Sequence, residues 1–144
     1  MEIKLVEKLR NYFEKYKLVK FRKGEIILRP GEKPNYIGFI KSGYVRIYTL
    51  SESGQEVTMQ FFKPIFYFTM IFGYGGIENR YYFEAITPVE MYMAPMAETK
   101  TFFTKNGETV RGILNGAMLT FVDLVEQMGS LLSGNAYSRV AAMV

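Results

Sequence analysis

Residues 21–48 read FRKGEIILRPGEKPNYIGFIKSGYVRIY, and this stretch decides the fold class. Short apolar runs in it are separated by three turn signals, which are RKGE at 22–25, RPGEKPN at 29–35 and KSG at 41–43. A fourth signal, SESG, follows at 51–54. Gly, Pro, Asn and Ser are the residues that tight turns favour. Turns that recur about every 7 to 12 residues predict an all-β sandwich or roll.

The segments between the turns alternate between apolar and polar residues with a period of two. This pattern is typical of strands that bury one face and expose the other. The rows predicted to be buried are Val45, Ile47 and Thr49; Val57, Met59 and Phe61; and Val89, Met91 and Met93. The roll is expected to span residues 18–95.

Helical patterns flank the predicted roll on both sides. Apolar residues at Ile3, Val6, Leu9, Phe13 and Tyr16 predict an amphipathic helix within residues 1–17. After Pro95, the segment AETKTFFTKNG predicts a short helix that ends at Asn106-Gly107, a sequence suited to a helix C-cap or hinge. The short helix and a long helix after it are expected to fill residues 96–133.

The long helix, predicted for 108–132, carries apolar residues in more than one row. Two rows at spacing seven interleave as the a and d positions of a coiled coil. They are Leu114, Phe121 and Met128, and Ala117, Leu124 and Leu131. A second apolar set lies beside them: Ile113, Met118, Val122, Val125 and Leu132. We expect one face to pack on the chain's own β-domain and the other on a twin helix. The alternative is a single wide stripe that faces the core of a monomer.

The sequence after the long helix reads SGNAYSRVAAMV. Ser133 and Gly134 break the helix, and Asn135 is a favourable N-cap for a new one. We expect a hinge at these three residues, with 134–144 forming the hinge and the start of a further domain. Because the new helix is cut short, the chain is expected to be a piece of a longer protein.

Composition narrows the possible functions. The 144 residues are 49% hydrophobic and 16% aromatic, which predicts a folded domain, and no apolar run is long enough to cross a bilayer. The chain has no Cys and no His, which removes thiolate and imidazole metal sites and His-assisted nucleophiles. We therefore expect no cofactor, no metal and no enzyme activity, and a cytoplasmic location. A β-roll or cupin-type enzyme is the alternative. The net charge of +4 permits a nucleic-acid partner without requiring one.

Several stretches together resemble the Crp/Fnr family of bacterial transcription regulators, named after the cyclic-AMP receptor protein and the fumarate–nitrate regulator. Residues 21–48 resemble the opening β-roll pattern, and FEAITPVEMYMAP at 83–95 resembles the strand pair that follows the ligand loop. The long helix resembles the dimerisation helix, and NAYSRVAAMV resembles the hinge and first helix of the DNA-binding domain, Arg139 included. The resemblance covers nearly all of the chain after residue 18.

The resemblance implies a mainly β fold with flanking helices. Its core would be a double-stranded β-helix, or jelly roll, like that of cyclic nucleotide-binding domains, followed by a long dimerisation helix. It also implies a homodimer in which the roll holds a small-molecule effector against that helix. DNA would be read by a C-terminal helix-turn-helix domain that this chain does not contain.

The resemblance places the ligand loop between the two halves of the roll. Members that bind cyclic nucleotides carry Gly-Glu and later Arg-Ser or Arg-Thr in this loop, where Glu binds the ribose and Arg the cyclic phosphate. Counting back from AIT at 85–87 puts Phe68 at the Gly position and Thr69 at the Glu position. Asn79 then stands at the Arg position, followed by Arg80. These departures argue against a cyclic nucleotide.

A different effector would meet an aromatic pocket. The predicted ligand-binding residues are Tyr67, Phe68, Thr69, Asn79, Arg80, Tyr81, Thr120 and Leu124. Such a site suits a small apolar or aromatic molecule, with Arg80 available for a carboxylate. One branch of the family senses halogenated aromatic acids, and the loop is similar to that branch. The open alternatives are a roll filled by its own side chains, a cyclic AMP- or cyclic GMP-binding regulatory domain, and a module attached to a kinase or channel.

Overall fold

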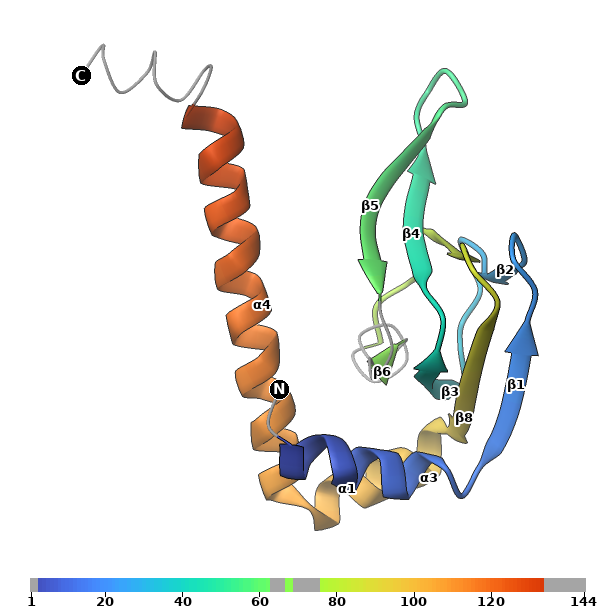
Figure 1. The fold of residues 1–144 in the computed structure, drawn as a ribbon, viewed down its shortest axis with the longest axis vertical. Coiled ribbons are helices and arrows are strands. Elements are labelled where there is room, and N and C mark those ends of the chain that lie inside the picture. The colour runs from blue at the N-terminus through green and yellow to red at the C-terminus, as the bar shows by residue number, and fades with distance from the viewer. Residues whose placement is uncertain (1–2, 63–66, 69–75, 134–144) are drawn as a thin grey trace.

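Two four-stranded antiparallel sheets face each other to form a β-roll, and helices lie at one end of it (Figure 1). This computed structural model describes residues 3–62, 67–68 and 76–133. One sheet has the strand order β1-β8-β3-β6 and the other β2-β7-β4-β5. The jelly-roll fold class, mainly β with flanking helices and a long C-terminal helix, is confirmed.

The described elements follow the order that the sequence predicts, from helix to strands to helices. The strands are β1 (Lys17–Phe21), β2 (Ile26–Leu28), β3 (Tyr36–Ser42), β4 (Val45–Leu50), β5 (Glu56–Phe62), β6 (Tyr67–Phe68), β7 (Tyr82–Ala85) and β8 (Val89–Pro95). The helices are α1 (Ile3–Phe13), α3 (Met96–Lys105) and α4 (Gly107–Ser133). None of the described helices has the length and apolar character that crossing a membrane requires.

The predicted turns carry glycines with backbone angles that other residues adopt only under strain. Gly24, Gly31, Gly43 and Gly54 all have positive φ angles, between 82° and 92°. At Gly43 the space is closed as well, because a Cβ atom there would overlap the carbonyl oxygen of Pro88. This explains why KSG precedes β4: the turn passes against the start of β8, and only glycine fits.

The core between the sheets comes from the inner rows of both. Its buried side chains are Leu28, Ile40, Val45, Ile47, Phe83, Ala85, Val89 and Met91. The predicted burial of Val45, Ile47, Val89 and Met91 is confirmed. Their period-two spacing places each row on the inner face of its sheet.

A second core fixes the helices to the roll. Leu5, Leu9, Tyr12 and Phe13 are the buried residues of α1, and the ring of Phe13 stacks on Phe39 of β3 with centroids 5.1 Å apart. The helix confirms the prediction, but its buried face differs from the predicted row, since Ile3 is exposed. Burial follows the face formed by positions 5, 9, 12 and 13 because this face meets β3 and α3.

The row predicted on β5 does not form one buried face. Val57 pairs with Thr49 and Phe61 pairs with Arg46, so the two apolar side chains lie on opposite faces of the sheet. A register shift between Ile47 and Tyr48 causes this, because it adds a residue to β5. Val57, Met59 and Phe61 are all exposed, and their predicted burial is wrong.

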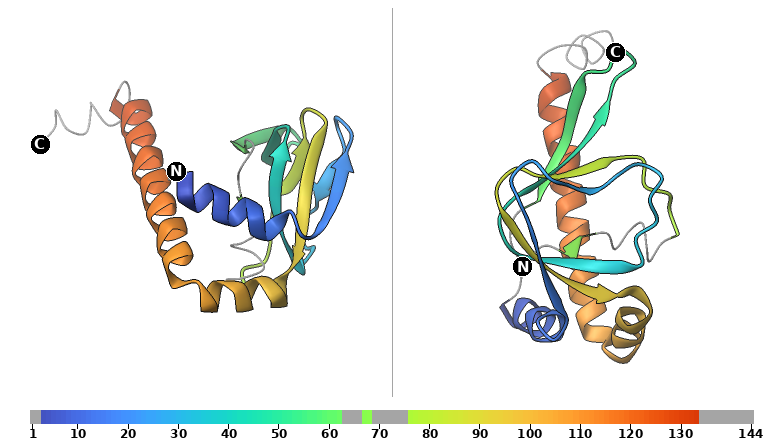
Figure 2. Two further views of the ribbon diagram at one scale, coloured as in Figure 1. Left: turned by 60° about the horizontal axis from the view of Figure 1, so that its bottom comes forward. Right: turned by 90° about the vertical axis from the view of Figure 1, so that its right-hand side faces the viewer.

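α4 leaves the roll at a tight corner. Asn106 caps α3 through its backbone N–H to Phe103 O, and its own carbonyl accepts from Thr109 N and Val110 N in the first turn of α4. Beyond the corner, α1 crosses α4 so closely that a Cβ on Gly112 would lie 3.0 Å from Cδ2 of Leu5. These contacts set the direction of α4 (Figure 2).

Only Thr109 and Ile113 of α4 are buried, and every residue from 117 to 133 is exposed. The long helix is confirmed, but the expectation that one of its faces packs on the chain's own roll is wrong for this part. The corner directs α4 away from the sheets, so no other described part of the chain covers the apolar rows of 117–133 (Figure 1).

Candidate functional site

Asn79, which stands at the predicted phosphate-binding position, lies buried in the segment before β7. Its amide nitrogen donates to Arg29 O at 3.0 Å and to Tyr81 O at 2.8 Å. Its side-chain oxygen accepts from Tyr81 N at 3.0 Å. One amide hydrogen therefore joins this segment to the turn before β3, and the other bonds within the segment itself. Asn79 thus holds the segment before β7 in place, and its predicted contact with an effector would have to displace these bonds.

Arg80, the next residue, lies in different surroundings from Asn79. Its side chain is exposed. Among the described residues, no carboxylate lies within ion-pair distance of it. Arg80 is thus a cation at the predicted site that is free to meet an anion.

Aromatic residues of the predicted site come from β6 and from the segment before β7. Tyr81 is half-buried and packs against the core between the sheets. Backbone pairing of β6 with β3 places Tyr67 opposite Phe39 and Phe68 opposite Gly38. Gly38 has no side chain to contribute at this residue pair. Thr69 lies outside the described residues.

The two predicted site residues of α4 are not brought to the roll in the single chain. Leu124 is exposed, and the Thr120 hydroxyl donates to Gly116 O within its own helix at 3.0 Å. The direction imposed at the α3–α4 corner accounts for this. A pocket that includes both would need α4, or a copy of it, to lie closer to the roll.

The predicted dimer rows form a continuous apolar surface on α4. Phe121 is 66% exposed and Leu131 75% exposed, values unusual for large apolar side chains. Leu114, Ala117, Leu124 and Met128 are exposed as well. Of the predicted hinge, Ser133 ends α4 and its hydroxyl donates to Ser130 O, while Gly134 and Asn135 lie outside the described residues.

A charged cluster on the outer face of the second sheet was not predicted. The guanidinium of Arg46 bonds Glu84 and Glu56, each at 2.6 Å, and donates to the Thr58 hydroxyl at 3.2 Å. It lies over the ring of Tyr48, 4.2 Å from the centroid, and Glu56 and Glu84 raise its pKa. The sequence signal was the alternation itself, which puts opposite charges on one face of adjacent strands.

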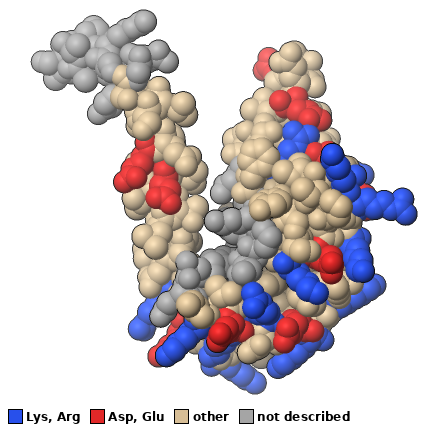
Figure 3. Space-filling model, in the orientation of Figure 1, with Lys and Arg blue, Asp and Glu red and all other residues tan. Residues whose placement is uncertain are grey.

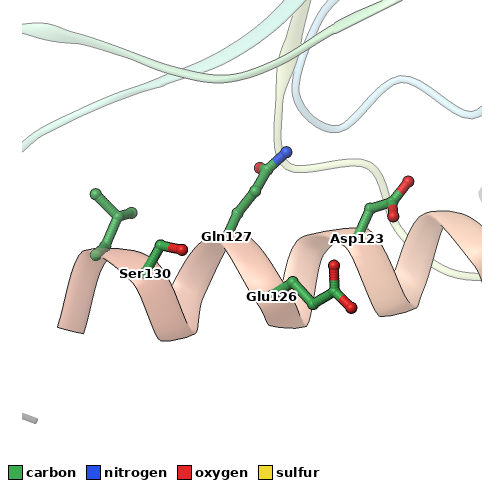
Figure 4. A pocket seen from close by; sticks show the side chains of 5 residues that line it. Asp123, Glu126, Gln127 and Ser130 are labelled. Atoms are coloured by element: carbon green, nitrogen blue, oxygen red, sulfur yellow. The ribbon is translucent and has the colours of Figure 1, made fainter. Parts of the chain in front are cut away.

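Neither of the two most distinct hollows in the described part of the chain contains a predicted ligand residue. A groove of about 380 Å³ lies over the Arg46–Glu84 pair, between Lys23 and Phe61. A depression of about 610 Å³ follows the last turns of α4 (Figure 4), lined by Asp123, Glu126, Gln127, Ser130 and Leu131. All five residues come from one helix, so the depression has a single wall. The described residues contain no cluster of carboxylates suited to a metal ion.

The sequence model of the cyclic nucleotide-binding domain family matches residues 18–106, more than half of the chain. The chain belongs to this family. The matched range begins in β1 and ends at the α3–α4 corner, so it contains the roll and the short helix. Family membership fixes the domain type, and the groups at the ligand loop decide what a given member binds.

Solved structures show the same fold at low sequence identity. CprK in complex with o-chlorophenolacetic acid is 20% identical, with a TM-score of 0.70; the match covers 90% of this chain and 54% of CprK. The transcriptional regulator TM1171 of Thermotoga maritima is 20% identical, with a TM-score of 0.71, over 87% of this chain and 98% of that one.

A proposed cAMP-binding regulatory protein of Silicibacter pomeroyi also matches, at 18% identity and a TM-score of 0.62, over 86% of this chain and 57% of that one. The chain thus spans little more than half the length of CprK and of this protein. No curated protein matches the sequence.

Proposed function

We propose that the chain is the sensory and dimerisation domain of a Crp/Fnr-type transcription regulator. Its family and its likeness to CprK and TM1171, which are regulators of this kind, support the proposal. The observation that carries it is the exposed apolar surface of α4. A surface of that size on a helix that follows a ligand-binding roll needs a protein partner, and a twin helix matches its seven-residue spacing.

The proposed partner of each chain is therefore a second copy. DNA would be contacted through a helix-turn-helix domain beyond the hinge at Ser133, Gly134 and Asn135. Effector binding would shift the population between two arrangements of the paired helices and so change the orientation of the DNA-binding domains. This role needs no catalytic residues and fits a cytoplasmic protein.

For the effector we propose a small aromatic acid rather than a cyclic nucleotide. A cyclic phosphate needs a buried cation, and the corresponding residue, Asn79, is neutral and already bonded to protein groups. Arg80 supplies an exposed cation one residue later, and aromatic residues of β6 and Tyr81 stand near it in sequence. An aromatic acid would use both features, with its ring against the aromatic residues and its carboxylate paired with Arg80. CprK, whose fold is similar, is described with o-chlorophenolacetic acid bound.

A cyclic nucleotide is the second candidate, and Arg80 is also the observation that favours it. An arginine one position away could reach a phosphate if the loop shifted. This candidate leaves the ribose without the carboxylate that other members use, because Thr69 occupies that position.

A thermal-shift titration with cyclic AMP, cyclic GMP and o-chlorophenolacetic acid separates the two candidates. A ligand present at 100 times its dissociation constant stabilises the folded state by about 2.7 kcal/mol. We expect stabilisation by the aromatic acid that is lost in Arg80→Ala and kept in Arg22→Ala, a matched exposed arginine in the turn after β1. Stabilisation by cyclic AMP that depends on Arg80 would overturn the aromatic-acid proposal.

A further inference from the structure

Asparagine followed by glycine occurs twice in the chain, at Asn106-Gly107 and at Asn115-Gly116. In this dipeptide an asparagine side chain reacts readily with the backbone nitrogen that follows it, because glycine has no Cβ to block the approach. The two pairs lie close together in the sequence but differ in their backbone surroundings. The structure therefore indicates which of the two is the more reactive.

Asn106 lies between α3 and α4 and belongs to neither helix. Its backbone angles, φ −129° and ψ 64°, are far from helical values. Gly107 is the first residue of α4, and the first N–H groups of a helix have no acceptor within that helix. A Cβ atom built on Gly107 would meet no atom of a more distant residue within 4 Å. The nitrogen of Gly107 is thus neither held by the helix nor enclosed by packing.

Asn115 and Gly116, by contrast, lie within the regular part of α4. Helix geometry directs the N–H of Gly116 at the carbonyl of Gly112, four residues earlier. This nitrogen is free to react only when the helix opens locally. Asn115 is nevertheless the more exposed of the two asparagines, since Asn106 is half-buried. Exposure alone would make Asn115 the faster site, whereas backbone conformation favours Asn106.

Water has access to the corner between α3 and α4. Lys105, Glu108 and Arg111, which flank Asn106 in the sequence, are all exposed. Figure 3 shows charged side chains at the lower end of α4, where the corner lies. A reaction at Asn106 that consumes a water molecule is therefore not hindered by burial.

We propose that Asn106 is a site of spontaneous deamidation that loosens this corner. The nitrogen of Gly107 attacks Cγ of Asn106, so that an N–Cγ bond forms and the Cγ–Nδ2 bond breaks. Nδ2 leaves as ammonia with the proton that the nitrogen of Gly107 gives up. Water then opens the resulting succinimide ring at one of its carbonyls. Opening at Cγ gives aspartate at this position, and opening at the main-chain carbonyl gives isoaspartate.

Both products remove interactions that hold the corner. The amide nitrogen of Asn106 donates to Phe102 O at 2.7 Å, and a carboxylate has no hydrogen to replace this bond. The new negative charge also lies at the C-terminal end of α3, where the helix dipole disfavours it. In isoaspartate the main chain gains one carbon, and the carbonyl that accepts from Thr109 N and Val110 N becomes a carboxylate outside the main chain. The direction of α4 is then no longer fixed.

Peptide mapping of the aged chain tests the inference. Trypsin cleaves after Lys105, Arg111 and Arg139, so the two asparagines fall in different peptides. The chain is incubated in mildly alkaline buffer, and mass spectrometry with fragmentation follows the conversion of each amide to an acid. An isoaspartyl-specific methyltransferase labels the isoaspartate product. In the folded chain we expect position 106 to convert several-fold faster than Asn115. In urea the two rates should become similar, because both pairs then lack backbone structure.

Gly107→Ala supplies the matched variant, because its methyl group fits the open space and blocks the attack. It should slow conversion of Asn106 several-fold and leave Asn115 unchanged. Aged wild-type protein should unfold at a lower temperature than fresh protein, and the aged variant should not. Equal or faster conversion of Asn115 in the folded chain would overturn the inference. Conversion of Asn106 without a change in unfolding temperature would overturn its effect on the corner. The reaction does not depend on the proposed dimer, so neither result bears on the proposed function.

Discussion

At the scale of single residues, Asn79 shows which features of a site can be predicted from the sequence and which depend on the fold. Counting along the chain puts it at the position where the resemblance implies a phosphate-binding arginine, and this assignment stays a prediction. Its hydrogen bond to Arg29 O could not be predicted, because the two residues are 50 positions apart and meet only in the folded roll. An uncharged residue at this position thus fills a structural role that a ligand-binding arginine would not.

Asn79→Ala should destabilise the fold by about 1–3 kcal/mol, because Arg29 O, Tyr81 O and Tyr81 N would lose their buried partner. Urea unfolding measures the change. Asn11→Ala, on the exposed face of α1, is the matched control and should change stability by less than about 0.5 kcal/mol. Equal effects of the two substitutions would contradict the structural role of Asn79.

Two buried threonines predict opposite outcomes for the same substitution. Thr99 bonds the Tyr12 hydroxyl and Pro95 O, whereas the Thr109 hydroxyl is buried without a hydrogen-bond partner in the described structure. Thr99→Val should therefore destabilise by about 1–3 kcal/mol, and Thr109→Val should be neutral or stabilising by about 1 kcal/mol. Unfolding of both variants under one set of conditions gives the comparison. Loss of stability in Thr109→Val would mean that its hydroxyl has a partner in solution.

At the scale of elements, the turns were the features that the sequence predicted best. RKGE, RPGEKPN, KSG and SESG all mark real turns, because each needs a glycine with positive φ. The β5 row failed for a physical reason. Period two assumes a regular strand with one covered face, and β5 is a bulged edge strand. Neither property is visible in the local sequence.

The hydrogen bond between the turn after α1 and α3 should make stability fall at alkaline pH. The Tyr16 hydroxyl donates to the Glu98 carboxylate at 2.6 Å, and this bond, with a smaller effect from Tyr12, raises the pKa of Tyr16 above its ordinary value near 10. Above that value the unfolded chain releases the Tyr16 proton while the folded chain keeps it, so the free energy of unfolding decreases as pH rises. Urea unfolding between about pH 9 and pH 11 measures the decrease, within the range set by the tyrosine pKa.

Tyr16→Phe removes the ionisable group and should flatten this decrease. Glu98→Gln keeps the tyrosine and removes the carboxylate that holds its proton, so it should flatten the decrease as well. If both variants follow the wild-type curve, the Tyr16–Glu98 bond does not form in solution.

At the scale of the whole molecule, the sequence correctly predicted a long helix with apolar rows on more than one side. The sequence could not show which surface covers which apolar row, because a heptad pattern does not determine the direction in which a helix leaves its domain. The corner at Asn106 and the close packing of Leu5 on Gly112 fix that direction, and they leave residues 117–133 exposed. The same limit explains why the sequence places Thr120 and Leu124 in a ligand pocket, whereas in the described part of the chain both lie on an exposed stretch of α4.

Sedimentation velocity of two matched α4 variants tests the proposed dimerisation domain most directly. Phe121 lies on the proposed seam and Leu119 on the opposite side of the helix, and their exposed fractions are similar, 66% and 69%. Phe121→Asp should sediment as a monomer, since it buries an unpaired charge in the seam. Leu119→Asp should sediment as a dimer like the wild type. A wild-type chain that is already monomeric at micromolar concentration, or a Phe121→Asp variant that remains dimeric, would contradict the account.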